Sequence, residues 1–574
     1  MSLTFSEQAA LTRLYADRIR RSAVAQVMGS PLLRWQFGAP VADELLLVPQ
    51  ELRTADPSFR DELRQGLFGL SGVVAQLGDG SVFDLKPPNE NWATELHGFG
   101  WLRHLRGSRE EDCRTLARSS VLDWIARFAN RGAPEWRPEV VGRRLISWLS
   151  NADMLLDNVT PADYDSMASS LGAQLVHLAA HWIDAPPGYG RLLSLISIST
   201  GAHCIAGHDA LAERMTPILM AELDKQVLAD GGHISRNPNV VVELLLDLLP
   251  LRTCFVARHR PVPDRIEACV ARLLGFLRFL RLGDGSVGRF NGMGATPFDS
   301  VATLLGYDAA PESPLTRAGN SCFAKLEAGR TIVLADYGAP PPLEFAGKAS
   351  AGCLSFELSV GPHAVFVNGG APGPTDQDWL AASRATASHN TLVIGARSSA
   401  RLVRGALLER LVGGVPLKGP ARTHGTVNPV TGGTVFDGHH DGYGGDFALL
   451  HQRSLTLEQD GRRLSGVERL TSDRTHATRL PRDVAYAVHF HLAPDVSCRL
   501  SDDPGLVTLT LPDRSHWYFR SEKATVSIEE GVHYADLVGP RRTQQIVLRG
   551  ACFGDSTIRW WFSAMADVGA KSTD

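Results

Sequence analysis

Apolar residues recur at helical spacing through the first half of the chain, up to about residue 306. Segments with this pattern repeat an apolar position every three to four residues, as a helix with one buried face does. They are residues 92–105, 114–130, 138–150, 161–183, 190–210, 211–228, 238–249 and 263–280. Consecutive helices of this length that pack in pairs predict an α/α toroid, or incomplete helical barrel, with a plain helical bundle as the alternative.

The pattern changes to alternation after a connector at residues 310–319. Short runs beyond it, such as residues 331–335 and 485–491, alternate apolar and polar positions and predict strands with one buried face. Asp460-Gly461 between two further runs predicts a hairpin turn. Many short strands over about 250 residues predict a large antiparallel β-sandwich.

The chain is therefore predicted to be a multidomain α + β protein. Its 574 residues exceed what one compact core usually accommodates. We expect an N-terminal helical extension over residues 1–40, an α/α toroid domain over residues 41–310 and a β-sandwich domain over residues 316–574.

Composition narrows the classes of partner. The formal charge of −4 does not indicate the strongly basic surface that nucleic-acid binding requires. An anionic polymer would have to bind through a local basic groove, which net charge does not reveal. The eight cysteines show no C-x-x-C spacing, which predicts isolated, mostly buried thiols rather than a disulfide framework or zinc knuckle.

The sequence also bears on location. No segment has the length and hydrophobicity of a membrane span, and residues 1–26 lack the apolar centre of a secretory signal. We therefore expect no membrane or nucleic-acid partner and a cytoplasmic location. A periplasmic location would require a leader missing from this numbering. The oligomeric state stays open.

Motifs in both halves resemble those of the heparinase II/III family. Residues 384–391, Arg-Ala-Thr-Ala-Ser-His-Asn-Thr, resemble the R-x-T-x-x-H-N-T signature of that family's C-terminal domain. In the helical half, residues 201–210 and 226–238 resemble its N-H-x-x-x-N helix and its Q-x-x-x-D-G-G-x-x-E-R-S-P segment. Residues 354–357, 440–443 and 490–494 add shorter matches. The resemblance implies a toroid followed by a β-sandwich, in a polysaccharide lyase that cleaves a uronate-containing glycan by β-elimination.

The chain departs from the family pattern at several positions. Ala202 stands where the family has the asparagine that contacts a uronate carboxylate. Val240 stands near the usual position of a tyrosine. Lys348, Ser350 and Gly352 occupy a stretch where relatives tend to carry His and Asp. Fold is therefore a firmer expectation than mechanism.

The resemblance implies candidate catalytic residues. A uronate lyase neutralises the C6 carboxylate, removes the C5 proton and protonates the departing O4, so it needs a base and an acid within hydrogen-bond reach of the sugar. His203 is the candidate charge neutraliser or base, although buried histidines that bond a backbone carbonyl are common. Tyr443 is the leading acid/base candidate. His389 either lines the catalytic cleft beside Arg384 or ligates a metal.

Candidate substrate-binding residues come from the same motifs and from one aromatic segment. They are Arg236, Asn237, Arg384, Trp92, Glu95 and His440. Asn237-Pro238 is also a standard helix start. Arg236 could bind a carboxylate with two hydrogen bonds or lie in solvent. Trp92 shares a helix face with Glu95, where packing on a neighbouring helix is the alternative to stacking a sugar.

No cofactor is required by this chemistry, although some relatives carry a structural zinc. His389 and His491 with a carboxylate such as Asp437 are chemically suitable ligands if the sheet brings them together. The alternative is that each histidine is a partly buried strand residue.

Two other functions remain open beside β-elimination on an acidic polysaccharide or oligosaccharide. Glu95 paired with Asp284 or Asp230 would suit a glycoside hydrolase with two carboxylates across the scissile bond. Loss of the usual residues at positions 202 and 240 would suit a carbohydrate-binding protein without catalysis.

Overall fold

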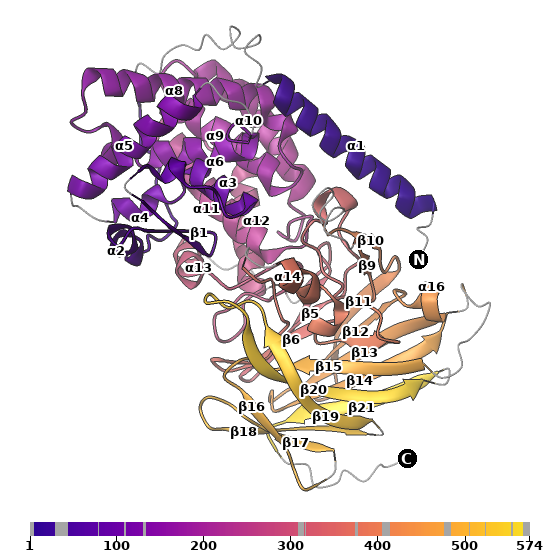
Figure 1. The fold of residues 1–574 in the computed structure, drawn as a ribbon. Coiled ribbons are helices and arrows are strands. Elements are labelled where there is room, and N and C mark those ends of the chain that lie inside the picture. The colour runs from indigo at the N-terminus through magenta and orange to yellow at the C-terminus, as the bar shows by residue number, and fades with distance from the viewer. Residues whose placement is uncertain are drawn as a thin grey trace.

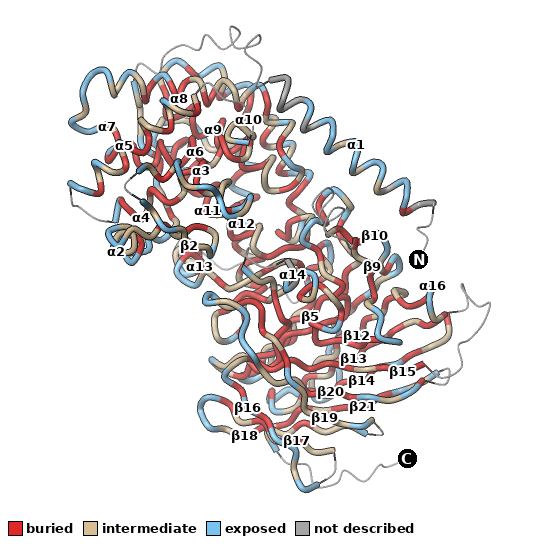
Figure 2. The backbone as a smooth tube through the Cα atoms, in the orientation of Figure 1, coloured by how far each residue is buried: buried red, intermediate tan, exposed pale blue. Residues whose placement is uncertain are grey.

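The computed structural model describes residues 5–28, 44–307, 315 and 317–565, apart from short internal segments at 79, 108–110, 130–133, 374–376, 404–413, 474, 476–483, 504, 523 and 553–554. Two domains lie one above the other (Figure 1), the helical domain first in sequence and the β domain second. Helix α1 (Phe5–Met28) runs along the outside of the helical domain towards the β domain, and most of its residues whose burial is described are exposed (Figure 2). The predicted fold class, a helical toroid followed by antiparallel sheets, is confirmed.

The helical domain buries one extended apolar core. Its helices are α2 (Ser58–Arg64), α3 (Glu90–Gly98), α4 (Leu102–Arg106), α5 (Glu111–Phe128), α6 (Pro138–Ser150), α7 (Ala152–Leu156), α8 (Pro161–His181), α9 (Tyr189–Cys204), α10 (Asp209–Gln226), α11 (Pro238–Ala257), α12 (Asp264–Phe279) and α13 (Phe298–Leu305). A short hairpin of β1 (Leu67–Leu70) and β2 (Val73–Gln76) lies between α2 and α3 and was not predicted.

Local chemistry sets the helix ends. The Thr160 hydroxyl accepts a hydrogen bond from the Asp163 N–H at 3.2 Å, and Pro161 follows at the first helical position, so α8 begins as predicted. The single helix expected over residues 92–105 is two helices, because Phe99 adopts a left-handed backbone (φ 57°) that ends α3. Helix α11 continues past Pro250 to Ala257.

The described part of the β domain contains four antiparallel sheets, and the smallest pairs β9 (Arg401–Leu402) with β10 (Pro416–Lys418). One has the strands β3 (Arg317–Ala318), β4 (Phe323–Ala328), β5 (Thr331–Asp336), β6 (Phe356–Val360) and β7 (His363–Phe366) in that order. Another has the order β19 (Thr525–His533), β20 (Arg541–Cys552), β15 (Val484–His491) and β8 (Leu392–Ile394). The largest has the order β11 (Thr423–Val430), β12 (Gly433–His440), β13 (Leu449–Glu458), β14 (Arg463–Ser472), β21 (Ser556–Ser563), β18 (His516–Glu522), β17 (Leu506–Thr510) and β16 (Ser497–Leu500).

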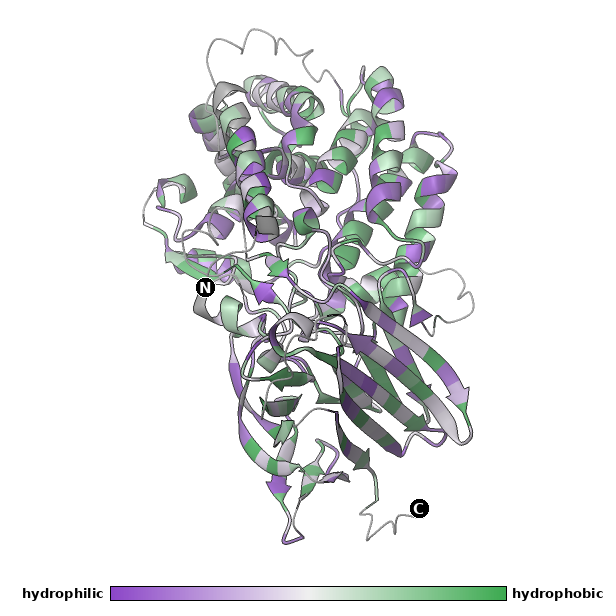
Figure 3. Ribbon diagram, turned by 90° about the vertical axis from the view of Figure 1, so that its right-hand side faces the viewer, coloured by the Kyte–Doolittle hydropathy of each residue, from purple (hydrophilic) through white to green (hydrophobic). Residues whose placement is uncertain are grey.

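Alternation of side chains gives these sheets their buried faces. Along β13, buried and half-buried residues alternate from Leu449 to Leu457. Figure 3 shows the corresponding stripes of green and purple along the long strands. The predicted turn at Asp460-Gly461 joins β13 to β14, and Gly461 has the positive φ (71°) that this turn requires. A second apolar core lies between the sheets.

Arg236 fastens the two domains together. It is buried and forms an ion pair with Asp336 of β5. Its Nε donates to the Ser321 carbonyl at 2.8 Å and its Nη1 to the Ala339 carbonyl at 3.0 Å. These contacts use the guanidinium inside the domain junction, so the predicted contact of Arg236 with substrate is wrong.

Two further expectations concern thiols and membranes. All eight cysteines are free thiols, and only Cys322 among them is partly exposed, as the spacing predicted. Within the described residues, no helix combines the length and hydrophobicity that crossing a bilayer demands.

Candidate functional site

A cleft of about 870 Å³ lies between the two domains. The helical domain lines it with Glu95 of α3, Arg143 of α6, Tyr189 of α9 and Asn239 of α11. The β domain lines it with Lys348, Ser350, Arg384 and His389, and loops at residues 289–295 and 370–373 complete the wall.

His389 presents one ring nitrogen as a proton acceptor. Its Nδ1 lies 2.8 Å from the Ala385 carbonyl oxygen, so Nδ1 carries the proton and donates it. Nε2 of the neutral ring is then unprotonated. Burial lowers the pKa of His389 below its usual value, although the bond to Ala385 opposes the shift, so the ring is neutral at neutral pH. A neutral imidazole on the wall of a cleft suits general-base chemistry.

Neighbouring residues hold this imidazole in place. A Cβ at residue 352 would come within 2.8 Å of the His389 ring, so Gly352 leaves the room that the ring needs. The buried side chain of Asn390 donates to the Phe356 carbonyl at 2.9 Å and accepts from the His491 N–H at 2.6 Å. The backbone next to His389 is therefore fixed by the sheet.

The β wall of the cleft carries positive charge. Lys348 is exposed, and no carboxylate lies within ion-pair distance of it in the described part of the chain. Arg384 is held by a bond from its Nε to the Ala349 carbonyl at 2.8 Å. Arg289 lies 3.5 Å from Glu357, whose pKa burial raises to about 7 against the opposing charge of Arg289. Such a wall favours a carboxylate-bearing ligand.

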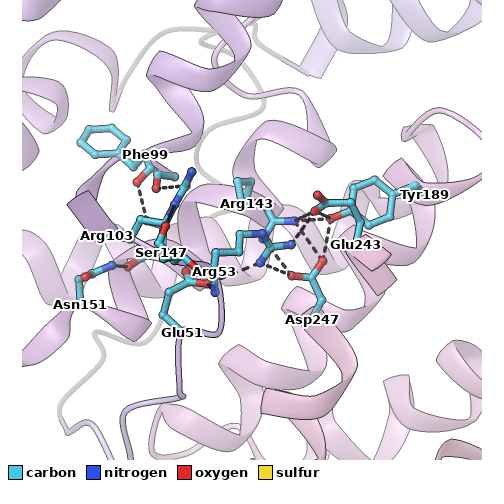
Figure 4. Close-up of polar contacts among 12 residues, drawn as sticks. Glu51, Arg53, Phe99, Arg103, Arg143, Ser147, Asn151, Tyr189, Glu243 and Asp247 are labelled. Carbon is cyan, nitrogen blue, oxygen red and sulfur yellow. Dashed lines mark hydrogen bonds and ion pairs between the residues drawn. The ribbon is translucent and has the colours of Figure 1, made fainter. Parts of the chain in front are cut away.

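A charge network around the buried carboxylate of Asp247 supports the helical wall (Figure 4). Arg143 forms two hydrogen bonds to Asp247, at 2.9 and 3.0 Å, and Arg53 reaches the same carboxylate at 2.9 Å. The Tyr189 phenol contacts Asp247 at 2.8 Å and Glu243 at 3.2 Å. Burial raises the pKa of Tyr189 well above its usual value, so the phenol keeps its proton.

Three of the predicted site residues line the cleft together. They are Glu95, Arg384 and His389. The Glu95 carboxylate accepts a hydrogen bond from the Ser71 hydroxyl at 2.6 Å. One cleft therefore brings together Glu95 from the aromatic segment of the helical half and Arg384 and His389 from the β-domain signature.

Three other predicted site residues have structural roles instead. Trp92 is fully buried, and its indole donates to the Val73 carbonyl at 3.2 Å, so the predicted sugar stacking is wrong. The Asn237 side chain caps α11 through the Asn239 N–H at 2.9 Å. His440 is buried and contacts His451 at 3.2 Å, so it does not line the cleft.

His203 and Tyr443 do not meet at the cleft. His203 lies at the far end of α9, a rise of about 21 Å from Tyr189 along the helix, and its Nδ1 bonds the Ser199 carbonyl at 2.7 Å. Tyr443 is 1% exposed inside the sandwich, where its hydroxyl donates to the Leu392 carbonyl at 2.7 Å. The prediction that these two rings face one sugar is therefore wrong.

The predicted zinc ligands do not form a site. His389 and His491 each use one ring nitrogen on a backbone carbonyl, while Asp437 is exposed on β12 and bonds Ser454. Within the described residues, no group of three or more His, Cys, Asp or Glu side chains is arranged to hold a metal. His389, His491 and Asp437 are therefore not arranged to hold a zinc ion.

The predicted hydrolytic carboxylate pair is also absent from the cleft. Asp230 accepts hydrogen bonds from the N–H groups of Ser321 and Gly232, at 2.7 and 3.1 Å. Asp284 bonds Ser286 and does not line the cleft. Neither carboxylate faces Glu95 across this cavity, so the geometry does not support the pairing.

Sequence patterns had not singled out Arg143, Tyr189, Asn239 or Arg289. The signal for Arg143 is a charged residue within a strongly apolar helix, which indicates either a buried pair or a site. Tyr189 follows a Pro-Pro-Gly loop at the start of α9, a position that helix periodicity does not mark.

Comparisons with known proteins agree with this architecture. Residues 310–561 match the family described as Heparinase II/III-like, C-terminal. FtsZ-localized protein C of Caulobacter vibrioides is 29% identical over 555 residues, which cover 94% of this chain and 95% of that protein.

Solved structures share the fold at low identity. A heparinase III structure has a TM-score of 0.69 at 13% identity and covers 98% of this chain and 92% of its own. Heparan sulfate lyase HepC from Pedobacter heparinus has a TM-score of 0.58 at 16% identity, covering 97% and 88%. Chondroitin AC lyase of Streptomyces coelicolor A3, in complex with chondroitin sulphate, has a TM-score of 0.52 at 13% identity, covering 89% and 79%.

Proposed function

We propose that this chain, whose residues 310–561 match the family described as Heparinase II/III-like, C-terminal, is a polysaccharide-lyase-like protein that holds an acidic glycan in the cleft between its domains. The observation that carries this proposal is the tautomer of His389. Because Ala385 fixes the proton on Nδ1, the opposite nitrogen is a proton acceptor on a wall that also carries Lys348 and Arg384.

The chemistry follows from these side chains. Lys348 and Arg384 bind the C6 carboxylate of a uronate, which makes the C5 proton more acidic. His389 Nε2 accepts that proton while the C4–O4 bond breaks and a C4–C5 double bond forms. The resulting imidazolium carries a proton that it can return to the departing O4, which restores the neutral ring.

Product analysis tests this proposal. The full chain is incubated with a panel of uronate polymers, including heparan sulfate, chondroitin sulfate and alginate. We expect ultraviolet absorbance from an unsaturated uronate at the new non-reducing end. New reducing ends without that absorbance would indicate hydrolysis and overturn β-elimination.

A second candidate function is glycan binding without turnover. Ala202 and Val240 replace the family's asparagine and tyrosine, and Tyr443 lies sealed in the sandwich. Binding of a polymer by the parent protein, with no product of either kind, would favour this function. It predicts that His389→Gln leaves the affinity for the polymer unchanged.

The curated relative suggests a cellular setting. Because the match to FtsZ-localized protein C runs along nearly the whole of both chains, we also propose that this protein localises with FtsZ. A fluorescent fusion imaged with labelled FtsZ in dividing cells tests it, and a diffuse signal throughout division would contradict it. The predicted cytoplasmic location is part of this proposal, and cell fractionation tests it.

A further inference from the structure

An aromatic pair lies beside the cleft and takes no part in the chemistry above. Trp379 belongs to helix α14 (Gln377–Ser383), and its side chain is 37% exposed. The Tyr534 ring lies behind it, with ring centroids 5.6 Å apart and planes inclined at 51°. Tyr534 itself is buried, so the pair presents the indole to solvent on a fixed support.

Two chain connections place this pair at the rim of the cleft. Ser383 lines the cleft and stands one helical turn after Trp379, so the two side chains share a helix face. The Tyr534 N–H donates to the Gly369 carbonyl at 2.8 Å, and the next residue, Gly370, lines the cleft. Figure 1 shows α14 between the two domains, near the ends of β19 and β20.

The loop that follows Tyr534 exposes both apolar and charged side chains. Leu537 and Val538, in the loop between β19 and β20, are 84% and 96% exposed. Asp536 of the same loop forms an ion pair with Arg541, at 3.4 Å. The cation-lined wall of the cleft is continuous with this rim through residues 369–373.

We propose that Trp379, supported by Tyr534, is a sugar-stacking subsite that extends the cleft, so that the ligand is an acidic oligosaccharide of several rings rather than a single uronate. The inference rests on the proposed function. The charged ring lies against Lys348 and Arg384, and a more distant ring places its C–H face on the indole. A pyranose face is apolar and slightly positive at its hydrogens, which suits the negative face of an aromatic ring.

The experiment measures affinity against ligand length. Disaccharides and hexasaccharides prepared from heparan sulfate and from chondroitin sulfate are titrated into the full chain by calorimetry. Trp379→Ala should weaken hexasaccharide binding roughly tenfold, as loss of one aromatic contact does, and leave disaccharide binding unchanged. Trp379→Phe should fall between the parent and the alanine variant, because it keeps a smaller ring.

Controls keep the outcomes distinct. Phe298→Ala removes another exposed aromatic ring, 52% exposed and outside the cleft lining, and should change neither affinity. Circular dichroism confirms folding, and loss of the hexasaccharide-induced fluorescence change in Trp379→Phe gives a second readout. Unchanged hexasaccharide affinity in Trp379→Ala overturns the subsite but leaves the proposed function standing. If neither ligand length binds the parent, the proposed function fails as well.

Discussion

Arg143 of α6 and Asp247 of α11 are joined by two hydrogen bonds, of 2.9 and 3.0 Å, on the helical side of the cleft. Arg53 approaches the same carboxylate from an irregular segment at 2.9 Å. Burial alone would raise the pKa of Asp247, but the two guanidinium groups hold it at about 2. One carboxylate therefore ties three segments of the helical domain together.

Removing this charge should destabilise the protein strongly. Asp247→Asn removes the buried carboxylate that Arg53 and Arg143 share, although Arg53 keeps its bond to Glu243 at 2.7 Å. Breaking a buried pair in this way costs about 3–5 kcal/mol. Urea unfolding followed by far-ultraviolet circular dichroism measures the loss. Asp153→Asn is the matched control, because the Asp153 side chain is 57% exposed and its pair with Arg106 is worth below about 1 kcal/mol. Equal losses in both variants would contradict the assigned role of Asp247.

Glycan binding should strengthen as pH falls through neutrality. The pKa of Glu357 is about 7, because its burial outweighs the charge of Arg289 beside it. Protonation below that pH removes the negative charge that offsets Arg289 on the cleft wall. His533 near Arg289 stays neutral in this window, since burial lowers its pKa to about 4. Glu357→Gln should bind with little pH dependence between about pH 6 and pH 8, as titration calorimetry can show.

The control for that experiment is Glu344→Gln, which removes an exposed carboxylate outside the cleft lining. Its binding should keep the pH dependence of the parent. Binding that weakens as pH falls would contradict the role assigned to Glu357.

Much of the fold followed from periodicity, because helix and strand patterns are local. The break at Phe99 did not follow, since the apolar spacing of residues 92–105 continues through it. There the left-handed backbone directs the Phe99 ring against Trp148, at a centroid distance of 5.3 Å. Tertiary packing of aromatic rings thus overrides the local helical pattern.

The site was harder to predict, because a sequence motif does not show whether its side chains point into a cleft or into the core. His389 and Arg384 were correctly predicted to line the cleft, because both belong to one short signature and the local turn orients them. Tyr443 also belongs to a motif, yet its ring turns into the sandwich. Arg143 and Asp247 stand 104 positions apart, so only the packed helices reveal their pairing.

Acid should destabilise the β domain partly through His491. Its Nε2 donates to the Ala387 carbonyl at 2.8 Å, and burial lowers its pKa to about 3. In the unfolded chain the pKa of this histidine is about 6.5. Below that pH the unfolded state therefore binds a proton at His491 that the folded state does not bind. Stability is therefore lost as pH falls from about 6.5 towards about 3, by up to about 1.4 kcal/mol per pH unit from this group.

The test compares the parent with His491→Gln, which retains an amide donor and does not titrate. Thermal unfolding at about pH 7.5 and about pH 5.5 should show a smaller loss of Tm in the variant. Equal losses would mean that other groups account for the acid sensitivity.

The last prediction separates the two candidate proton carriers. His389→Gln removes the proposed base and should lower kcat by about 10²–10⁴-fold, the usual contribution of a positioned acid–base group. Tyr443→Phe removes a bond to the Leu392 carbonyl inside the sandwich, so it should cost about 1 kcal/mol of stability and leave kcat nearly unchanged. In the parent, kcat/KM should be constant above about pH 6.5 and fall at lower pH, because the lowered pKa keeps His389 neutral until the medium is acidic. An active His389→Gln beside an inactive, folded Tyr443→Phe would reverse the assignment, since the buried phenol would then have to reach the substrate by a rearrangement of the sandwich.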